Sequence, residues 1–164
     1  MSLQYILDGN NIINHPSFSS CNRKIQDSRI SLLEYIAIKK LCGSLRNKII
    51  VVFDGYPYSE NLRQINPGMN IIFSKDVSAD EKIKNILEKS PNSKNTVVVS
   101  DDKEIIFFVK SFGAIPLPVE EFINPGITQR AKKLQKIEEE FIKAELTHTQ
   151  MEKINQELKK LWLK

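Results

Sequence analysis

The stretch KIIVVFDG, residues 48–55, decides the fold class of this sequence. Its five consecutive apolar residues are of types that favour β-strands, and the run ends at an acidic residue and a glycine, which form turns. Because no polar residue alternates with the apolar ones, we expect this strand to be covered on both faces of its sheet. The stretch therefore favours a parallel sheet.

Strands and helices alternate on both sides of this stretch. Short apolar runs predict further strands at residues 4–7, 70–73, 96–99 and 114–117. Apolar residues at helical spacing predict a helix over residues 27–41, with Gly43 as its C-cap, and another over residues 101–111. A third helix is predicted to begin at the capping box formed by Ser78 and Glu81 and to end before Pro91. Turn-forming residues predict loops at 8–11 and 56–68. This alternation predicts an α/β sandwich with right-handed crossovers.

The sequence changes in character after Pro125 and Gly126. Residues 128–164 carry nine Lys or Arg against six Asp or Glu, with apolar residues at helical spacing, whereas residues 1–127 carry 15 against 14. We therefore expect a domain over residues 1–124 and an amphipathic helical extension over residues 125–164. The apolar stripe of the extension either packs on the domain or binds a partner.

Composition excludes several classes of protein. With 41% hydrophobic and 27% charged residues the chain is typical of globular domains, and its longest apolar runs are too short to cross a bilayer. The first residues lack a signal-peptide pattern, so we expect neither secretion nor a membrane partner. Cys21 and Cys42 lack zinc-site spacing and are too few for a disulfide framework, which favours the cytoplasm or the reducing interior of an organelle. No glycine-rich phosphate loop is present, which disfavours nucleotide cofactors.

Acidic residues follow the predicted strands. Asp8, Asp54 and the pair Asp101-Asp102 each come directly after a strand or one residue later, and Asp80 lies in the first turn of the helix after the strand at 70–73. The carboxyl ends of parallel strands open on one edge of the sheet, so we expect these carboxylates to converge there.

Converging carboxylates repel each other and need a compensating cation. The candidate ligands are all oxygen atoms, which favours Mg²⁺ or Mn²⁺ over Zn²⁺. An acidic metal site in a protein of net charge +4 suits hydrolysis of a phosphodiester. Each aspartate alone is better explained as a helix N-cap; the coincidence of four is what points to a site.

The motifs, taken in order, resemble the YacP-like NYN domain family. The resemblance spans residues 3 to about 122 and is carried by the stretches ILDGNNII (6–13), VVFDG (51–55), IFS (72–74) with ADE (79–81), VVSD (98–101) and FGA (112–114). It implies a PIN-like three-layer sandwich with a central, mostly parallel sheet. It also implies a metal-dependent endoribonuclease with an acidic pocket. Together with the oxygen ligands, this predicts cleavage of single-stranded RNA with Mg²⁺ or Mn²⁺.

Residue roles follow from this resemblance, position by position. The catalytic and metal-holding acids would be Asp8, Asp54, Asp80 and Asp101. Supporting polar groups would be Asn11, Ser100 and Asp102, whereas Glu81 is already explained by its capping box. The chain departs from the family pattern at Asn10 and Ile105, which bears on substrate handling more than on metal binding.

Basic and aromatic residues near this edge are candidate RNA contacts. They are Arg63, Lys75, Lys103, Tyr56 and Tyr58; lysine and arginine would hold phosphates, and the tyrosines would stack on unpaired bases or else pin their loop to the domain. His15, next to Pro16 in a polar segment, is interpreted as a surface histidine rather than a general base.

Two other functions compete with a nuclease. A non-catalytic RNA-binding protein, or a scaffold within a ribonucleoprotein, would keep the acidic pocket and bind RNA without its acids. A phosphorylated receiver-like switch also uses acids at strand ends, but it needs a lysine at the end of the fifth strand, where residues 115–117 offer none.

Overall fold

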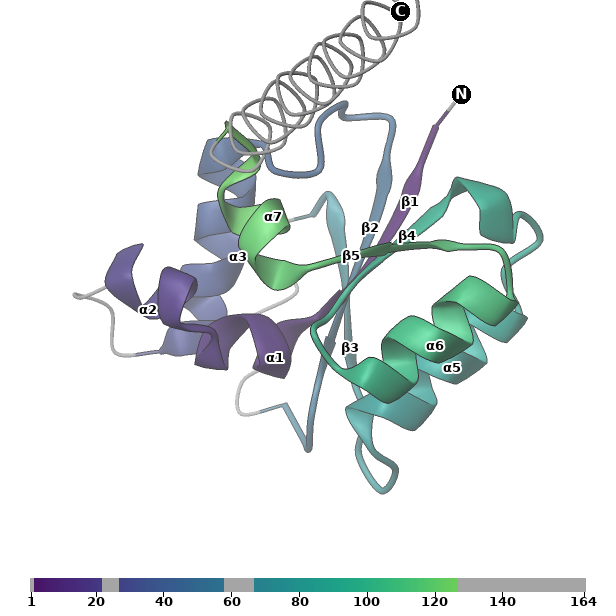
Figure 1. Ribbon diagram of the computed structural model, residues 1–164. Helices are drawn as coiled ribbons and strands as arrows, with labels where there is room; N and C mark the ends of the chain where they lie inside the picture. Colours follow the sequence, from purple (N-terminus) through teal and green to yellow (C-terminus); the bar gives the residue numbers. More distant parts are fainter. Residues whose placement is uncertain (1, 22–26, 58–66, 127–164) are drawn as a thin grey trace, which may run out of the picture. The chain divides into compact units, whose positions relative to one another are not determined.

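A five-stranded parallel sheet forms the centre of the computed structural model, which describes residues 2–21, 27–57 and 67–126 (Figure 1). The strands are β1 (Gln4–Asp8), β2 (Lys48–Phe53), β3 (Met69–Phe73), β4 (Thr96–Val99) and β5 (Ile115–Leu117). Their order is β3-β2-β1-β4-β5, and every neighbouring pair is parallel. Each predicted strand is confirmed to within one residue at either end.

Helices cover both faces of the sheet. On one side lie α1 (Gly9–Asn14), α2 (Pro16–Cys21), α3 (Ser28–Lys39) and α7 (Val119–Ile123), and on the other α5 (Ala79–Glu88) and α6 (Lys103–Ser111), while the short 3₁₀ helix η1 (Ser93–Asn95) leads into β4 (Figure 1). Alternate residues of β2 supply the two cores: Val51 and Phe53 pack with α1, α3 and α7, and Ile50 and Val52 with α5 and α6. The three-layer α/β sandwich is therefore confirmed.

Side-chain caps start the predicted helices where the sequence places them. Ser78 Oγ accepts a hydrogen bond from the backbone N–H of Glu81 at 3.1 Å, as the capping box requires. Asp102 Oδ1 accepts from the N–H groups of Glu104 at 2.7 Å and Ile105 at 3.1 Å at the start of α6. Because each of these helices begins just beyond a strand end, the caps lie at one edge of the sheet.

The expected loop at residues 8–11 is wrong, because helix α1 begins directly after β1. Asp8 is its N-cap and accepts the backbone N–H of Asn11 at 3.0 Å. The glycine and two asparagines that follow Asp8 suggest a turn by composition, but the capping bond organises them into a helix. Gly9 is required by close packing: a Cβ there would lie 2.3 Å from Phe53 Cε1 and 2.9 Å from the carbonyl oxygen of Val52.

Other helix boundaries also differ from expectation. Helix α3 ends earlier than predicted, and Lys40, with φ of 50°, adopts the left-handed C-cap conformation instead of Gly43. Gly43, with φ of 71°, lies in the turn that follows. Helix α7 was not predicted, because five residues are too few to show helical periodicity.

Part of the sequence lies outside the described residues. The predicted loop at 56–68 is described only at its two ends. One compact unit of the chain ends at Ile123, but nearly all of the predicted helical extension, residues 125–164, is outside the described residues, so the extension and the boundary at 124 stay predictions. Among the described residues, no helix is long and apolar enough to span a membrane.

Candidate active site

The strand register brings the predicted acids to one edge of the sheet. In the β1–β2 pair Asp8 is level with Val52, and in the β1–β4 pair Leu7 is level with Val99. Asp8 is thus the last residue of β1, Asp54 follows β2, and Ser100 and Asp101 follow β4. Because all strands are parallel, these residues lie at the same edge of the sheet, as expected.

Asp8 is the buried member of the group, with 4% of its surface exposed. Its Oδ1 accepts the N–H of Asn11, and its Oδ2 accepts the hydroxyl of Ser100 at 3.1 Å. Burial raises the pKa of Asp8 to about 6; the two hydrogen bonds oppose this shift, and the charges of Asp80 and Asp54 add to it. Asp8 therefore carries a negative charge at neutral pH in a place that disfavours one.

Asp54 is an exposed residue whose carboxylate is held by two other elements. Its Oδ1 accepts the backbone N–H of Ala79 at 2.8 Å and lies 3.4 Å from the donor hydroxyl of Ser74. Its Oδ2 accepts the side-chain amide of Asn10 at 3.2 Å. These bonds fix Asp54 between the start of α5 and the start of α1.

Asp80 completes an electrostatically connected set. It lies in the first turn of α5, and its pKa is raised by partial burial and by the neighbouring charges of Asp102, Asp54 and Glu104, while Lys84 lowers it. Its carboxylate accepts no hydrogen bond from the described part of the chain. Asp80 therefore remains available to a ligand.

Asp101 and Asp102 are used differently. The Oδ1 atom of Asp101 accepts the backbone N–H of Val119 at 3.0 Å and so holds the start of α7, while its Oδ2 lies 3.5 Å from Nε2 of His15. Asp102 caps α6 and raises the pKa of Asp80 through its charge. The electrostatic set thus includes Asp8, Asp54, Asp80 and Asp102, and the role of Asp101 as a metal ligand stays a prediction.

Two of the three predicted supporting groups, Ser100 and Asn11, contact these acids. Ser100 donates its hydroxyl to Asp8 and accepts the N–H of Asp102 at 3.2 Å. Asn11 Oδ1 accepts the N–H of Asp101 at 3.1 Å, which ties the start of α1 to the end of β4. The Ser100 side chain therefore orients the Asp8 carboxylate, and the Asn11 side chain holds the backbone at Asp101.

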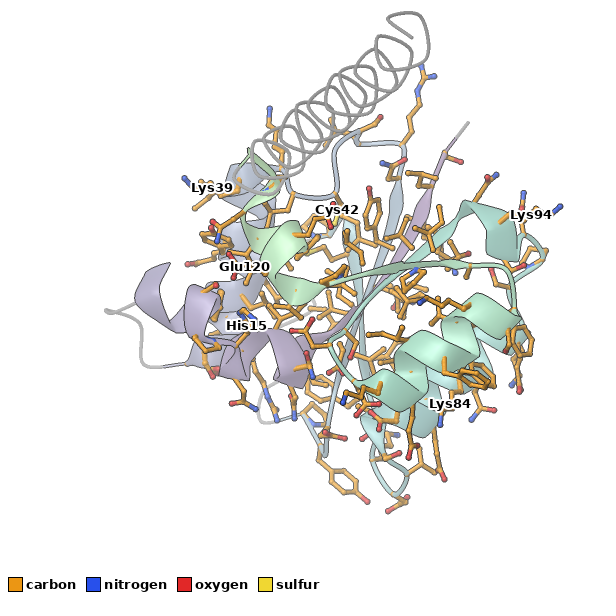
Figure 2. All side chains as sticks on the ribbon, viewed as in Figure 1. His15, Lys39, Cys42, Lys84, Lys94 and Glu120 are labelled. Carbon is orange, nitrogen blue, oxygen red and sulfur yellow. The ribbon has the colours of Figure 1, made fainter. Side chains whose placement is uncertain are left out.

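His15 is a residue whose position sequence reasoning missed. It does not lie in a polar surface loop: it is the C-cap of α1, its side chain is only 21% exposed, and Nδ1 accepts the N–H of Ser17 at 3.2 Å, so Nε2 faces Asp101. Figure 2 labels it between the short helices α1 and α2. Because His15 and Asp101 are far apart in sequence, no local pattern marks their contact.

Arg29 was also missed. Its guanidinium carbon lies 5.5 Å from the ring centre of Phe53 and 5.4 Å from that of Phe73, and Nη2 donates to the carbonyl oxygen of Asp54 at 3.1 Å. This arginine fixes the backbone at the end of β2. Its spacing in α3 gave no indication of that contact.

Those predicted RNA contacts that belong to the described residues lie at the same edge of the sheet. Lys75 and Lys103 are both exposed, the first just after β3 and the second at the start of α6. Tyr56 is 58% exposed and donates its hydroxyl to the carboxylate of Asp76, which raises the pKa of the tyrosine. Arg63 and Tyr58 lie outside the described residues, and all these contacts stay predictions.

The donor set fits a hard divalent cation by chemistry. The acids offer only oxygen atoms, and the buried carboxylate of Asp8 has two anionic neighbours. In the described parts of the chain, however, no three His, Cys, Asp or Glu side chains converge closely enough to hold an ion by themselves. Mg²⁺ is usually held by one or two carboxylates, several waters and substrate phosphates, so it does not require a cluster of three acids.

Comparisons with known proteins point to one family. The profile of the YacP-like NYN domain matches residues 5–163. Rae1 (YacP) from Bacillus subtilis has a similar structure, with a TM-score of 0.56 and 22% identity over 95% of each chain. A single-residue mutant of that protein gives 0.55 and 22%, covering 83% of this chain and 85% of the other. No curated protein matches the sequence significantly.

Proposed function

This chain belongs to the YacP-like NYN domain family, which is related to the PIN-like nucleases, and from this premise we propose that it is a metal-dependent endoribonuclease. The proposed reaction is hydrolysis of phosphodiester bonds in single-stranded RNA. The observation that carries the proposal is the buried carboxylate of Asp8, electrostatically coupled to Asp54 and Asp80 at the carboxyl edge of a parallel sheet.

The electrostatics of this edge favour a bound cation. Asp8, Asp54 and Asp80 form no ion pair with a lysine or arginine of the described residues. Their mutual repulsion and the burial of Asp8 are unfavourable unless a positive charge neutralises them. An ion that binds there relieves this repulsion, and the relief adds to its affinity.

Each residue at this edge has a separate role in the proposed reaction. Asp8, Asp54 and Asp80 would hold Mg²⁺ or Mn²⁺, in part through bound waters, and the ion would supply an activated water and neutralise charge on the scissile phosphate. Ser100 and Asn11 keep Asp8 and the end of β4 in place through their hydrogen bonds. Lys75 and Lys103 would hold the RNA backbone on either side through its phosphates.

A non-catalytic RNA-binding protein is the second candidate. It is favoured by the lack of three converging metal ligands among the described residues. This candidate, including a scaffold role within a ribonucleoprotein, predicts RNA binding that survives loss of the acids.

The cellular location proposed is a reducing compartment such as the cytoplasm. Cys42 is free and buried, and burial raises the pKa of its thiol to about 12, so it is protonated and unreactive. A buried, protonated thiol does not form a disulfide readily, which is consistent with a reducing compartment.

The test is cleavage of an end-labelled single-stranded RNA by the full chain with Mn²⁺ and with EDTA. We expect internal cuts that require the metal and disappear in Asp8→Asn. Glu88→Gln, an exposed acid at the far end of α5 from Asp80, is the matched control and should cut like the wild type. RNA binding without cleavage by any of these proteins would favour the scaffold instead.

A further inference from the structure

An aromatic groove lies between α5 and α6. It has a volume of about 410 Å³ and is lined by Lys84, Lys103, Glu104, Phe107 and Phe108. The side chain of Phe107 is 77% exposed. A phenylalanine this exposed buries little apolar surface, so its contribution to folding is small. Together with Phe108 it lines the groove with adjoining aromatic surface, and contiguous apolar patches of this kind mark interaction sites.

The Phe108 ring of the groove is held by two contacts. Phe108 stacks on Phe112, with centroids 4.6 Å apart, and the ammonium of Lys84 lies 5.8 Å from the centre of the Phe108 ring. The same ammonium is 3.8 Å from the carboxylate of Glu104. Figure 2 labels Lys84, which lies where α5 and α6 adjoin. The groove thus places the exposed Phe107 ring beside a held aromatic ring and positive charge.

The groove leads to the acidic edge. Lys103 directly follows Asp102, and Lys84 lies four residues, or about one helical turn, after Asp80 on α5. Lys84 lowers and Glu104 raises the pKa of Asp80, so the charges of the groove act on an acid of the carboxyl edge. A strand of RNA held in the groove would therefore continue towards the acids.

We propose that this groove binds unpaired RNA next to the scissile phosphate, with a base stacked on the exposed ring of Phe107 beside Phe108 and backbone phosphates held by Lys84 and Lys103. Stacking on aromatic rings beside cations is how proteins hold single strands without reading sequence. The two lysines complement an anionic polymer, and Glu104 partly opposes them. This proposal rests on the proposed function, because it assigns that site its substrate path.

The test is binding of a fluorescein-labelled 12-nucleotide oligouridylate to the full chain, measured by fluorescence anisotropy in EDTA so that no cleavage occurs. We expect Phe107→Ala to raise the dissociation constant by about fivefold or more, which corresponds to the loss of one base–aromatic stack. Ile38→Ala is the matched control, because Ile38 is 76% exposed on α3, on the opposite side of the sheet. It should bind like the wild type.

Charge variants test the phosphate contacts. Lys103→Gln should weaken binding and reduce the slope of log affinity against log salt by about 0.7, whereas Lys39→Gln on α3 should change neither. Glu104→Gln should tighten binding, because it removes an anion and releases Lys84. A merely structural role for Glu104 would not produce tighter binding.

Each remaining outcome decides between the proposals. If Phe107→Ala and Ile38→Ala bind equally well, the groove proposal is overturned, and a change in oligomeric state in Phe107→Ala would identify a protein interface instead. If wild-type protein cuts RNA and Asp8→Asn does not, the proposed nuclease stands even when the groove fails. If no protein cuts RNA but Phe107→Ala still weakens binding, the groove stands and the nuclease does not.

Discussion

The two edges of the sheet carry polar networks of different character. At the amino edge neutral groups satisfy one another: Gln4 Nε2 donates to Ser90 Oγ at 3.4 Å, that hydroxyl lies 3.3 Å from the hydroxyl of Thr96, and Thr96 donates to the carbonyl of Asn92 at 3.1 Å. At the carboxyl edge aspartates accept backbone N–H groups of distant elements. Among the described residues, the amino edge buries no charged side chain, whereas the carboxyl edge buries Asp8.

The difference shows that this fold does not need charge to close a sheet edge. Neutral hydroxyls and amides hold the amino edge together at no cost of burying an ionised group. The carboxyl edge accepts that cost at Asp8 and adds like charges around it, which is typical of a site kept for function rather than stability. The volume of a depression does not identify the functional edge. A depression of about 480 Å³ lies at the amino edge, and Lys48 is the one charged residue among its described lining residues.

The largest expected effect is on catalytic activity, which substitutions at the carboxyl edge should lower and substitutions at the amino edge should not. Asp54→Asn should lower kcat/KM for RNA cleavage by about 100-fold or more, since even loss of an outer-shell partner of a metal ligand commonly costs about 10- to 100-fold. Ser90→Ala at the amino edge should stay within about twofold. Initial rates at saturating Mn²⁺ measure both, and similar losses in the two variants would remove the functional distinction between the edges.

Removing the charge of Asp8 should increase the stability of the fold, although it should abolish activity. Its pKa is raised from 3.8 in the unfolded chain to about 6 in the fold, so the fold is favoured while Asp8 is protonated. That contribution is complete below about pH 4 and is lost as pH rises through 6, a loss of about 3 kcal/mol. An asparagine at this position would accept the N–H of Asn11 with Oδ1 and donate Nδ2 to the hydroxyl oxygen of Ser100, but would carry no charge.

We therefore expect Asp8→Asn to raise the free energy of unfolding at pH 8 in EDTA by up to about 3 kcal/mol. The gain should vanish at pH 4. Urea unfolding at the two pH values measures it, and Thr96→Val, which alters the neutral edge, should show a difference from wild type that does not depend on pH. A pH-independent gain in Asp8→Asn would show that the charge is not the cause.

Metal should stabilise the carboxyl edge alone. Mn²⁺ or Mg²⁺ at 100 times its dissociation constant should stabilise the wild type by about 2.7 kcal/mol, and EDTA should reverse this. Thermal unfolding with and without the ion gives the shift in Tm. Asp8→Asn should lose most of that shift, and Glu88→Gln should keep it; an equal shift in both variants would place the ion elsewhere.

The sheet could be predicted from sequence because its signals are local. Each strand is a short apolar run, and residues 48–55 already indicate burial on both faces. Asp80 could be placed at the acidic edge for the same reason, since the capping box at Ser78 starts a helix just after a parallel strand. These features need only neighbouring residues and the rule that parallel strands share an edge.

The parts that escaped prediction depend on contacts between distant residues. His15 meets Asp101, and Arg29 meets the rings of Phe53 and Phe73, only after the sheet and its helices have assembled. Helix α1 was mistaken for a loop because its first residues favour turns, although Asp8 caps them. Periodicity cannot report such contacts, because it describes which face a residue occupies and not which residue lies opposite.

The smallest expected effect concerns the glycine that lets α1 start so close to β2. Ala is normally the better helix former, but a Cβ on Gly9 would overlap the ring of Phe53, so Gly9→Ala should lower the free energy of unfolding by about 1–3 kcal/mol. A Cβ added to Gly68, just before β3 at the amino edge, would have no other atom within 4 Å, so Gly68→Ala should be neutral or slightly stabilising. Urea unfolding compares the two. If Gly9→Ala is as stable as Gly68→Ala, Phe53 moves aside readily, and the close approach that holds Asp8 beside Asp54 is softer than the packing indicates.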